Sequence, residues 1–241
     1  MGSKPLIAIT GASSGIGAAT ASAFAASGYP TLLIARRLDR LEGLGLRGAH
    51  LAGVDVLDTG AVANAIRAAE AQHGPVDLLV NNAGLMPLGT IETQDPGEWR
   101  SMFEVNVLAL LEVTRLVIAD MSSRQHGTII NMGSVAGRNI YGNHTAYCGT
   151  KFAVHAISEG LRKEVAARNV RVTVIAPAMV ETELLEHTTN PAAVSDYQAY
   201  KASIGGALSP TVVADIIKHV YELPQEICIR EVVLAPTHQD A

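Results

Sequence analysis

Short apolar runs alternate along the chain with longer stretches in which apolar and polar positions follow a helical period. The apolar runs predict seven β-strands, at residues 6–10, 31–35, 50–54, 77–80, 128–132, 172–176 and 231–235, of which the first is buried. The stretches between them predict helices at residues 15–27, 38–44, 61–72, 98–122, 145–168 and 211–222. Residues 178–209 are a mixture of polar and apolar positions.

Regular alternation of strand and helix is typical of a doubly wound parallel sheet. We therefore expect an α/β fold of the Rossmann type, in which a parallel seven-stranded sheet carries helices on both faces as three αβα layers. No long linker, repeat or composition break interrupts the pattern, so residues 1–241 are expected to form a single domain. Ligands of such sheets bind beyond the carboxyl ends of the strands.

Composition and charge exclude several classes of function. Charged residues make up 17% of the chain, its net charge is −5 and no basic run stands out, which argues against nucleic-acid binding. No signal peptide and no apolar span of about 20 residues is found, so no membrane contact is expected. Cys148 and Cys228 are too few for a disulfide framework, which favours the cytoplasm. The histidines lack metal-ligand spacing, and no catalytic metal is expected.

A glycine-rich turn follows the first predicted strand, with Gly11, Gly15 and Gly17 in the spacing Gly-x-x-x-Gly-x-Gly. Gly11 permits a tight turn, Gly15 lets the backbone approach a ligand, and Gly17 lets the helix pack near the sheet. The free N–H groups at the start of the next helix suit a diphosphate. A glycine turn without a ligand is one alternative. A nucleophile elbow at Ser13 is another, but no earlier loop exists to supply its second oxyanion donor.

The residues after the second and third strands bear on the identity of the phosphate ligand. A carboxylate after the second strand binds the ribose 2′-OH of NAD, whereas this chain has Arg36 and Arg37. Guanidinium groups suit a 2′-phosphate, so the predicted cofactor is NADP (NADPH). An exposed arginine pair at a helix start is the alternative. Asp55, followed by Val56, is placed to accept a hydrogen bond from the adenine amino group.

Tyr147 and Lys151 are four residues apart, which puts both side chains on one face of the predicted helix. A cation beside a phenol favours the phenolate and lowers its pKa from about 10. The pair therefore predicts a tyrosine that exchanges a proton near neutral pH. Taken alone, the two residues are also compatible with an ordinary half-exposed helix pair.

The ordered set of motifs resembles the short-chain dehydrogenase/reductase family, in its NADP-preferring branch of roughly 250-residue, single-domain proteins. The matching positions are Thr10-Gly-x-x-x-Gly-Ile-Gly17, Asn81-Asn-Ala-Gly84, Asn106, Ser134 and Tyr147-x-x-x-Lys151. The resemblance implies that residues 1–241 form one NAD(P)-binding Rossmann domain. It also implies an NADP(H)-dependent oxidoreductase that reduces a ketone or aldehyde to an alcohol, or catalyses the reverse, by hydride transfer.

The resemblance assigns roles to four residues. Tyr147 is the general acid in reduction and the base in oxidation. Lys151 holds the nicotinamide ribose, and Ser134 hydrogen-bonds the carbonyl oxygen. Asn106 holds a water that links Lys151 to solvent. The expected cofactor contacts are Gly11, Ser13, Ser14, Gly15, Ile16, Gly17, Arg36, Arg37, Asp55, Val56, Asn82, Ala83, Gly84, Tyr147, Lys151, Pro177, Val180 and Thr182.

Residues 178–209 resemble the family's substrate-covering loop. The expected substrate contacts are Ser134, Val135, Tyr141, His144, Tyr147, Met179, Leu184 and Leu185. The family usually has Pro-Gly after the sixth strand, whereas this chain has Pro177-Ala178. Because alanine lacks the freedom of glycine at positive φ, we expect a locally different backbone there.

Two other functions and the state of assembly stay open. An NADP-dependent 3-hydroxy acid dehydrogenase needs a cation for the carboxylate, for which Arg138 and Lys201 are the candidates. A non-catalytic regulator that senses a dinucleotide has no need of Ser134, Tyr147 and Lys151 together. By resemblance we expect a homo-oligomer, a tetramer or else a dimer, that pairs the helices at residues 98–122 and 145–168.

Overall fold

The computed structural model describes residues 4–240, so residues 1–3 and 241 of the predicted domain lie outside the described residues. Seven strands form one sheet in the order β3-β2-β1-β4-β5-β6-β7, and every neighbouring pair is parallel. The strands are β1 (Leu6–Thr10), β2 (Thr31–Ala35), β3 (His50–Gly53), β4 (Val76–Asn81), β5 (Thr128–Met132), β6 (Arg171–Pro177) and β7 (Glu231–Leu234). The predicted doubly wound parallel sheet is confirmed.

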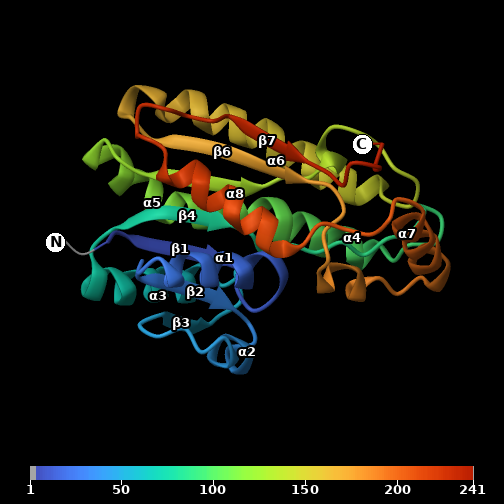
Figure 1. The fold of residues 1–241 in the computed structure, drawn as a ribbon, viewed down its shortest axis with the longest axis horizontal. Helices are drawn as coiled ribbons and strands as arrows, with labels where there is room; N and C mark the ends of the chain where they lie inside the picture. The colour runs from blue at the N-terminus through green and yellow to red at the C-terminus, as the bar shows by residue number, and fades with distance from the viewer. Residues whose placement is uncertain (1–3, 241) are drawn as a thin grey trace.

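Helices cover both faces of the sheet, as the prediction of three layers requires (Figure 1). Strand β1 is apolar on both faces: Leu6 and Ala8 pack into one core, and Ile7 and Ile9 pack into the other. The first core is covered by α3 (Thr59–His73), α5 (Ala109–Arg124) and α6 (Thr145–Val165), and the second by α1 (Gly15–Ala26), α2 (Leu38–Gly43) and α8 (Pro210–Glu222). No helix within residues 4–240 is long and apolar enough to cross a membrane.

The helix predicted at residues 98–122 differs from the structure, which contains two α-helices joined by a wider turn. α4 (Pro96–Phe103) leads into the π-helical turn Glu104–Leu108, and α5 follows it directly. A π-helical turn inserts an extra residue into the helical ladder and re-aims the side chains on it. Asn106 lies in this turn and is buried. The helix predicted at residues 145–168 is also shorter, because α6 ends at Val165 and a 3₁₀ turn follows.

The mixed segment 178–209 contains helical structure of its own. A 3₁₀ turn covers Glu183–His187, and α7 covers Pro191–Ser203. Asn190 caps α7 by accepting hydrogen bonds from two backbone N–H groups, and proline suits the first helical position. The base of the segment is closed, because Leu208 N–H donates to Met179 O at 2.9 Å and its carbonyl accepts from Glu181 N–H at 2.9 Å. In Figure 1, α7 lies beside α4, beyond the carboxyl ends of the strands.

Candidate active site

A cavity of about 920 Å³ lies at the carboxyl ends of the strands. The segments that follow β1, β2, β4, β5 and β6 all line it, because parallel strands end at the same edge of the sheet. Most of the predicted site residues lie in its wall: Gly11, Ser13, Ser14, Gly15, Ile16, Arg36, Arg37, Asp55, Val56, Asn82, Ala83, Gly84, Ser134, Val135, Tyr141, His144, Tyr147, Lys151, Pro177, Met179, Val180, Thr182 and Leu184. Gly17, Asn106 and Leu185 do not line it.

The glycine loop is joined tightly to the turn that follows β4. Asn82 Nδ2 donates to the Thr10 and Gly11 carbonyl oxygens at 3.0 and 3.1 Å, and Thr10 Oγ1 accepts from the Asn82 and Ala83 N–H groups at 3.0 and 3.1 Å. Gly11 has a φ of +65°, which favours glycine. A Cβ on Gly17 would overlap the Gly11 carbonyl oxygen. Gly17 therefore shapes the loop from behind the cavity wall.

The first turn of α1 faces the cavity with free donors. Ser14 is the N-cap residue, yet its side chain makes no capping hydrogen bond. The backbone N–H groups at this helix start therefore have no capping side chain, and the helix dipole adds partial positive charge. Ser13, Ser14, Gly15 and Ile16 all line the cavity. A diphosphate fits these donors, so the residues present suit a dinucleotide.

Arg37 lies against the glycine loop. Its Nη2 donates to the Ser13 and Ser14 hydroxyl oxygens at 3.3 and 3.4 Å and to Glu183 Oε2 at 3.1 Å. Arg40 Nη1 also donates to both Glu183 oxygens, at 2.5 and 2.7 Å, and its hydrogen bonds hold the pKa of that carboxyl below its usual range. Sequence patterns gave no signal for this contact, because Glu183 is 146 residues away from Arg37. In residues 4–240, Arg36 has no hydrogen-bonded side-chain partner.

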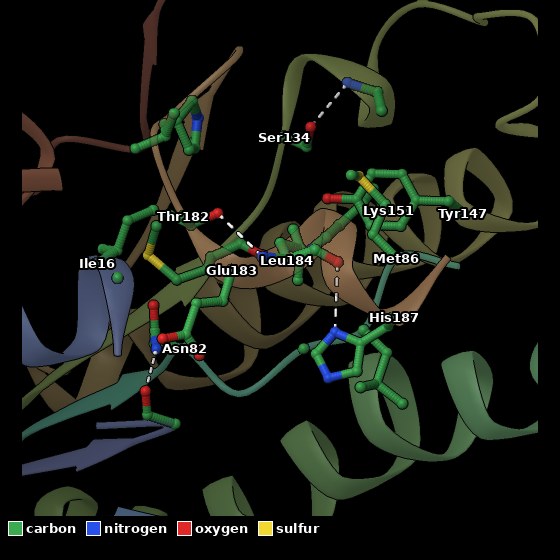
Figure 2. Close-up of a pocket in the computed structure, with 18 of the residues that line it drawn as sticks. Ile16, Asn82, Met86, Ser134, Tyr147, Lys151, Thr182, Glu183, Leu184 and His187 are labelled. Carbon is green, nitrogen blue, oxygen red and sulfur yellow. Dashed lines mark hydrogen bonds between the residues drawn. The ribbon is translucent and has the colours of Figure 1, made fainter. Parts of the chain in front are cut away.

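Tyr147 and Lys151 project from one face of α6 into the same cavity, as Figure 2 shows. They are 6% and 7% exposed. Lys151 Nζ lies 5.7 Å from the centroid of the Tyr147 ring and donates to Met132 O, the last residue of β5, at 2.7 Å. The ammonium group therefore lies over the face of the phenol ring. Its hydrogen bond to a carbonyl oxygen holds it at the end of β5.

The prediction that Lys151 lowers the pKa of Tyr147 is wrong when only the protein's own groups act on the phenol. Burial raises the pKa of Tyr147 above its usual value, and the nearby Ser134 hydroxyl works in the opposite direction. Burial also lowers the pKa of Lys151 to about 8. Spacing on a helix places the two side chains correctly, but it does not reveal how far the site is withdrawn from water.

Ser134 and Asn106 are both held by backbone groups. Ser134 Oγ accepts from Ala136 N–H at 3.1 Å. Asn106 Oδ1 accepts from Leu85 N–H at 2.8 Å, and its Nδ2 donates to Leu85 O at 2.9 Å and to Thr150 Oγ1 at 3.1 Å. The Asn106 side chain thus joins the π-helical turn to the segment after β4 and to α6. Its role in holding a water stays a prediction.

The far end of the cavity is aromatic. The His144 ring stacks on Tyr197, with centroids 6.3 Å apart, and presents an edge to Tyr147 at the same separation. Burial lowers the pKa of His144. Tyr141 Oη is buried and has no hydrogen-bond partner within residues 4–240. The cavity is also lined by residues that the sequence analysis did not assign to it, including Met86, Asn143, His187, Asp196, Gln239 and Asp240.

Ala178 lies in a bend directly after β6, and the expected difference from the family's backbone stays a prediction. It is not among the non-glycine residues with positive φ, and its N–H donates to Leu234 O at 2.8 Å. Val180 and Thr182 both line the cavity, and their contact with a cofactor stays a prediction. The Thr182 hydroxyl accepts from Leu184 N–H at 3.4 Å (Figure 2).

Replacing Lys151 with methionine tests its buried charge. Its pKa of about 8 lies below the usual 10.5, so the unfolded chain binds an extra proton between these values. The stability of the wild type therefore rises as pH increases through this window. We expect the free energy of unfolding of the wild type, relative to Lys151→Met, to rise by up to about 3 kcal/mol between about pH 8 and pH 10. Urea denaturation followed by circular dichroism measures it.

Lys163→Met, at an exposed position of the same helix, is the matched control for loss of one positive charge. A difference between wild type and Lys151→Met that stays flat across this pH range would contradict the interpretation.

Known proteins share both the sequence and the fold. The short chain dehydrogenase family matches residues 5–193. An uncharacterised oxidoreductase of Staphylococcus saprophyticus is 36% identical over an alignment of 241 positions, which covers 97% of this chain and 96% of the relative. A closed form of serine dehydrogenase complexed with NADP+ has a TM-score of 0.89 at 30% identity and covers 98% of this chain and 96% of its own. An alcohol dehydrogenase from the archaeon Thermococcus sibiricus, complexed with 5-hydroxy-NADP, has a TM-score of 0.84 at 25% identity and covers 99% of both chains. The chain therefore belongs to the short-chain dehydrogenase/reductase family of NAD(P)-dependent oxidoreductases.

Proposed function

We propose that the protein is an NADP(H)-dependent oxidoreductase that reduces a ketone or aldehyde to an alcohol, or catalyses the reverse, with Tyr147 as general acid or base. The observation that carries this proposal is the shared cavity: Tyr147, Lys151 and Ser134 line the same chamber as the uncapped start of α1. A proton donor and a diphosphate site thus lie within the reach of one dinucleotide. When bound, that dinucleotide supplies the hydride and, in its oxidised form, a positively charged ring.

The chain's own residues supply the proton and the orientation. Ser134 donates its hydroxyl hydrogen to the substrate oxygen as negative charge develops there. Tyr147 donates a proton to the same oxygen in reduction and accepts one in oxidation. Lys151 keeps a positive charge beside the phenol and holds the ribose hydroxyls. An apolar cluster that includes Met86 and Tyr197 packs around Tyr147 and limits the contact of the phenol with water.

The cofactor is NADP in this proposal because the Arg37 guanidinium lies against the glycine loop and Arg36 lines the same cavity. Arg37 contacts both loop serines, and Arg36 lines the cavity without a competing side-chain partner in the described chain. A 2′-phosphate in this region gains charge-assisted hydrogen bonds from either side chain. Asp55 and Val56 line the cavity nearby and are assigned to the adenine.

Residues 178–209 act as the substrate cover of a single domain in this proposal. Backbone hydrogen bonds join Met179 and Glu181 to Leu208, so the two ends of the segment lie together and the segment forms one closed loop. Side chains from this loop, including Leu184 and Tyr197, pack in one apolar cluster with Tyr147. The cover and the proton donor therefore share one wall.

The 3-hydroxy acid dehydrogenase is the second candidate, favoured by the likeness to serine dehydrogenase. A carboxylate substrate needs a free cation at the far end of the cavity. Arg138, however, donates two hydrogen bonds to Glu231 at 2.8 and 2.6 Å, and Lys201 donates to Glu181 at 2.5 Å. Neither cation lines the cavity. Their engagement favours an uncharged carbonyl compound or alcohol over a hydroxy acid.

We also propose a cytoplasmic homo-oligomer, a tetramer or else a dimer. Cys148 and Cys228 are both free thiols, which suits a reducing compartment. Large apolar side chains are exposed on α4, the π-helical turn, α5 and α6, namely Phe103, Leu108, Leu111 and Phe152. These are the helices expected to pair between copies of the chain, and an apolar surface of this kind suits such pairing.

Tyr147→Phe tests the mechanism, because it keeps the ring and removes only the phenolic oxygen. We expect unchanged NADPH affinity by fluorescence titration and a loss of turnover of about 100-fold to 10,000-fold. Turnover is followed by cofactor absorbance with a panel of ketones, aldehydes, alcohols and 3-hydroxy acids. The control is Tyr29→Phe, which changes a phenol that hydrogen-bonds Glu222 away from the cavity.

The outcomes of this panel separate the candidate functions. Turnover that survives Tyr147→Phe contradicts the mechanism. Binding of NADPH by the wild type without turnover of any compound favours the dinucleotide-sensing regulator. A strong preference for 3-hydroxy acids favours the second candidate.

Replacing both Arg36 and Arg37 with alanine tests the choice of cofactor. We expect kcat/KM with NADPH to fall about 100-fold or more, since each charge-assisted hydrogen bond contributes about 1.5–3 kcal/mol. With NADH, which lacks the 2′-phosphate, it should change little. Arg47→Ala removes an exposed positive charge outside the cavity wall and is the control. Wild-type preference for NADH, or a double variant that still prefers NADPH, would overturn the assignment.

A further inference from the structure

The imidazole of His155 lies against the backbone of Ser134. His155 is on α6, one turn after Lys151, and its Nε2 accepts a hydrogen bond from Ser134 N–H at 3.4 Å. Its Nδ1 lies 3.3 Å from Glu231 Oε1. A ring nitrogen that accepts carries no hydrogen, so the proton of the neutral ring is on Nδ1 and faces the carboxylate.

Two glycines make room for this ring. A Cβ on Gly133 would lie 2.5 Å from His155 Nε2, and a Cβ on Gly137 would lie 2.6 Å from the same atom. Ser134 lies between these glycines in the turn that follows β5. The imidazole therefore fills the space against which the turn is folded, and it contacts the turn on both sides of the serine.

Arg138, in the segment after β5, anchors the Glu231 carboxylate. Arg138, immediately after the 3₁₀ turn Val135–Gly137, donates to Glu231 through Nε at 2.8 Å and through Nη2 at 2.6 Å. Glu231 begins β7 and pairs with Val174 of β6. The Glu231 carboxylate thus links β7, at the sheet edge, to the turn that carries Ser134. The same carboxylate also contacts His155.

We propose that His155 is a positioning residue for Ser134, held in the required tautomer by Glu231, and that protonation of His155 removes this support. The proposal rests on the proposed function of Ser134. A protonated ring presents N–H at Nε2, which faces the Ser134 N–H donor and cannot accept from it. The serine turn then loses its backbone partner.

The groups that face the ring are Glu231 from β7, Lys151 from α6 and Arg138 from the turn after β5. Burial lowers the pKa of His155, Glu231 opposes this effect, and Lys151 and Arg138 reinforce it. The ring is therefore neutral at neutral pH. Activity that depends on it is present above the His155 pKa and declines as pH falls through that value.

Variants at position 155 separate positioning from folding. His155→Leu keeps apolar bulk without an acceptor, whereas His155→Gln offers an amide oxygen that does not titrate. We expect His155→Leu to lower kcat about 10-fold to 100-fold with the KM for NADPH unchanged, as for a small misplacement of a reacting group. His155→Gln should recover most of kcat and lose the His155-dependent decline on the acid side. His219→Leu, at an exposed histidine of α8, is the control. The substrate is whichever carbonyl compound of the panel turns over fastest.

Two further measurements keep the proposal falsifiable if His155→Leu does not fold. In nitrogen-15 NMR of the wild type at neutral pH, we expect His155 to carry its proton on Nδ1. In Glu231→Gln, we expect the acid-side decline of kcat to move to lower pH, because the carboxylate no longer raises the pKa of the ring.

Each of three results would overturn the proposal: a folded His155→Leu variant with kcat within twofold of wild type, a neutral ring protonated on Nε2, or an acid-side decline that Glu231→Gln leaves in place. The NMR result does not depend on turnover. A wild type without any turnover would instead count against the proposed function. The tautomer of His155 would still test whether Glu231 holds the ring as proposed.

Discussion

The site depends on an ammonium group held inside the protein without a carboxylate partner. In residues 4–240, Lys151 forms no ion pair, and its hydrogen bond goes to the Met132 carbonyl oxygen. Burial of an unpaired cation opposes its charge, which is why the pKa of Lys151 falls to about 8. The same burial raises the pKa of Tyr147. Both side chains are therefore poised for a partner that brings charge and hydroxyl groups into the cavity.

Parallel strands make this arrangement possible. Every strand of the sheet ends at the same edge, so the glycine loop after β1, the Ser134 turn after β5 and the cover after β6 meet there without any long connection. The supporting contacts come from behind this edge. Asn106 fixes the segment after β4, Glu183 bridges the cover to Arg37, and Glu231 stabilises the Ser134 turn through His155.

Much of the fold was predictable because the inner strands are mainly apolar and buried on both faces. Residues 6–10 and 128–132 are mainly apolar in the sequence and are fully buried strands in the structure. The residues at the strand ends were equally visible, since they stand in ordered motifs, and most of them line the cavity. Their chemical roles stay predictions. The π-helical turn at Glu104–Leu108 was not visible, because a π-helix and an α-helix have similar hydrophobic periods. α7 did have a signal, the cap Asn190 followed by Pro191.

What the sequence concealed was the set of contacts between distant segments. Glu183 meets Arg37, and Glu231 meets His155, only after the sheet has formed. No local pattern reports such pairs. The direction of the Tyr147 pKa was missed for the same reason: helix spacing gives the distance to Lys151, whereas burial depends on packing by α4 and by the cover, which includes α7.

The most direct test of the account is the pKa of Tyr147, measured by NMR of tyrosine labelled with carbon-13 at Cζ, first without and then with saturating NADP+. The account predicts a pKa above the usual value of about 10 for the protein alone. It predicts a value below 10 with NADP+, because a positively charged ring joins Lys151 beside the phenol. A pKa that stays above 10 with NADP+ bound would contradict it.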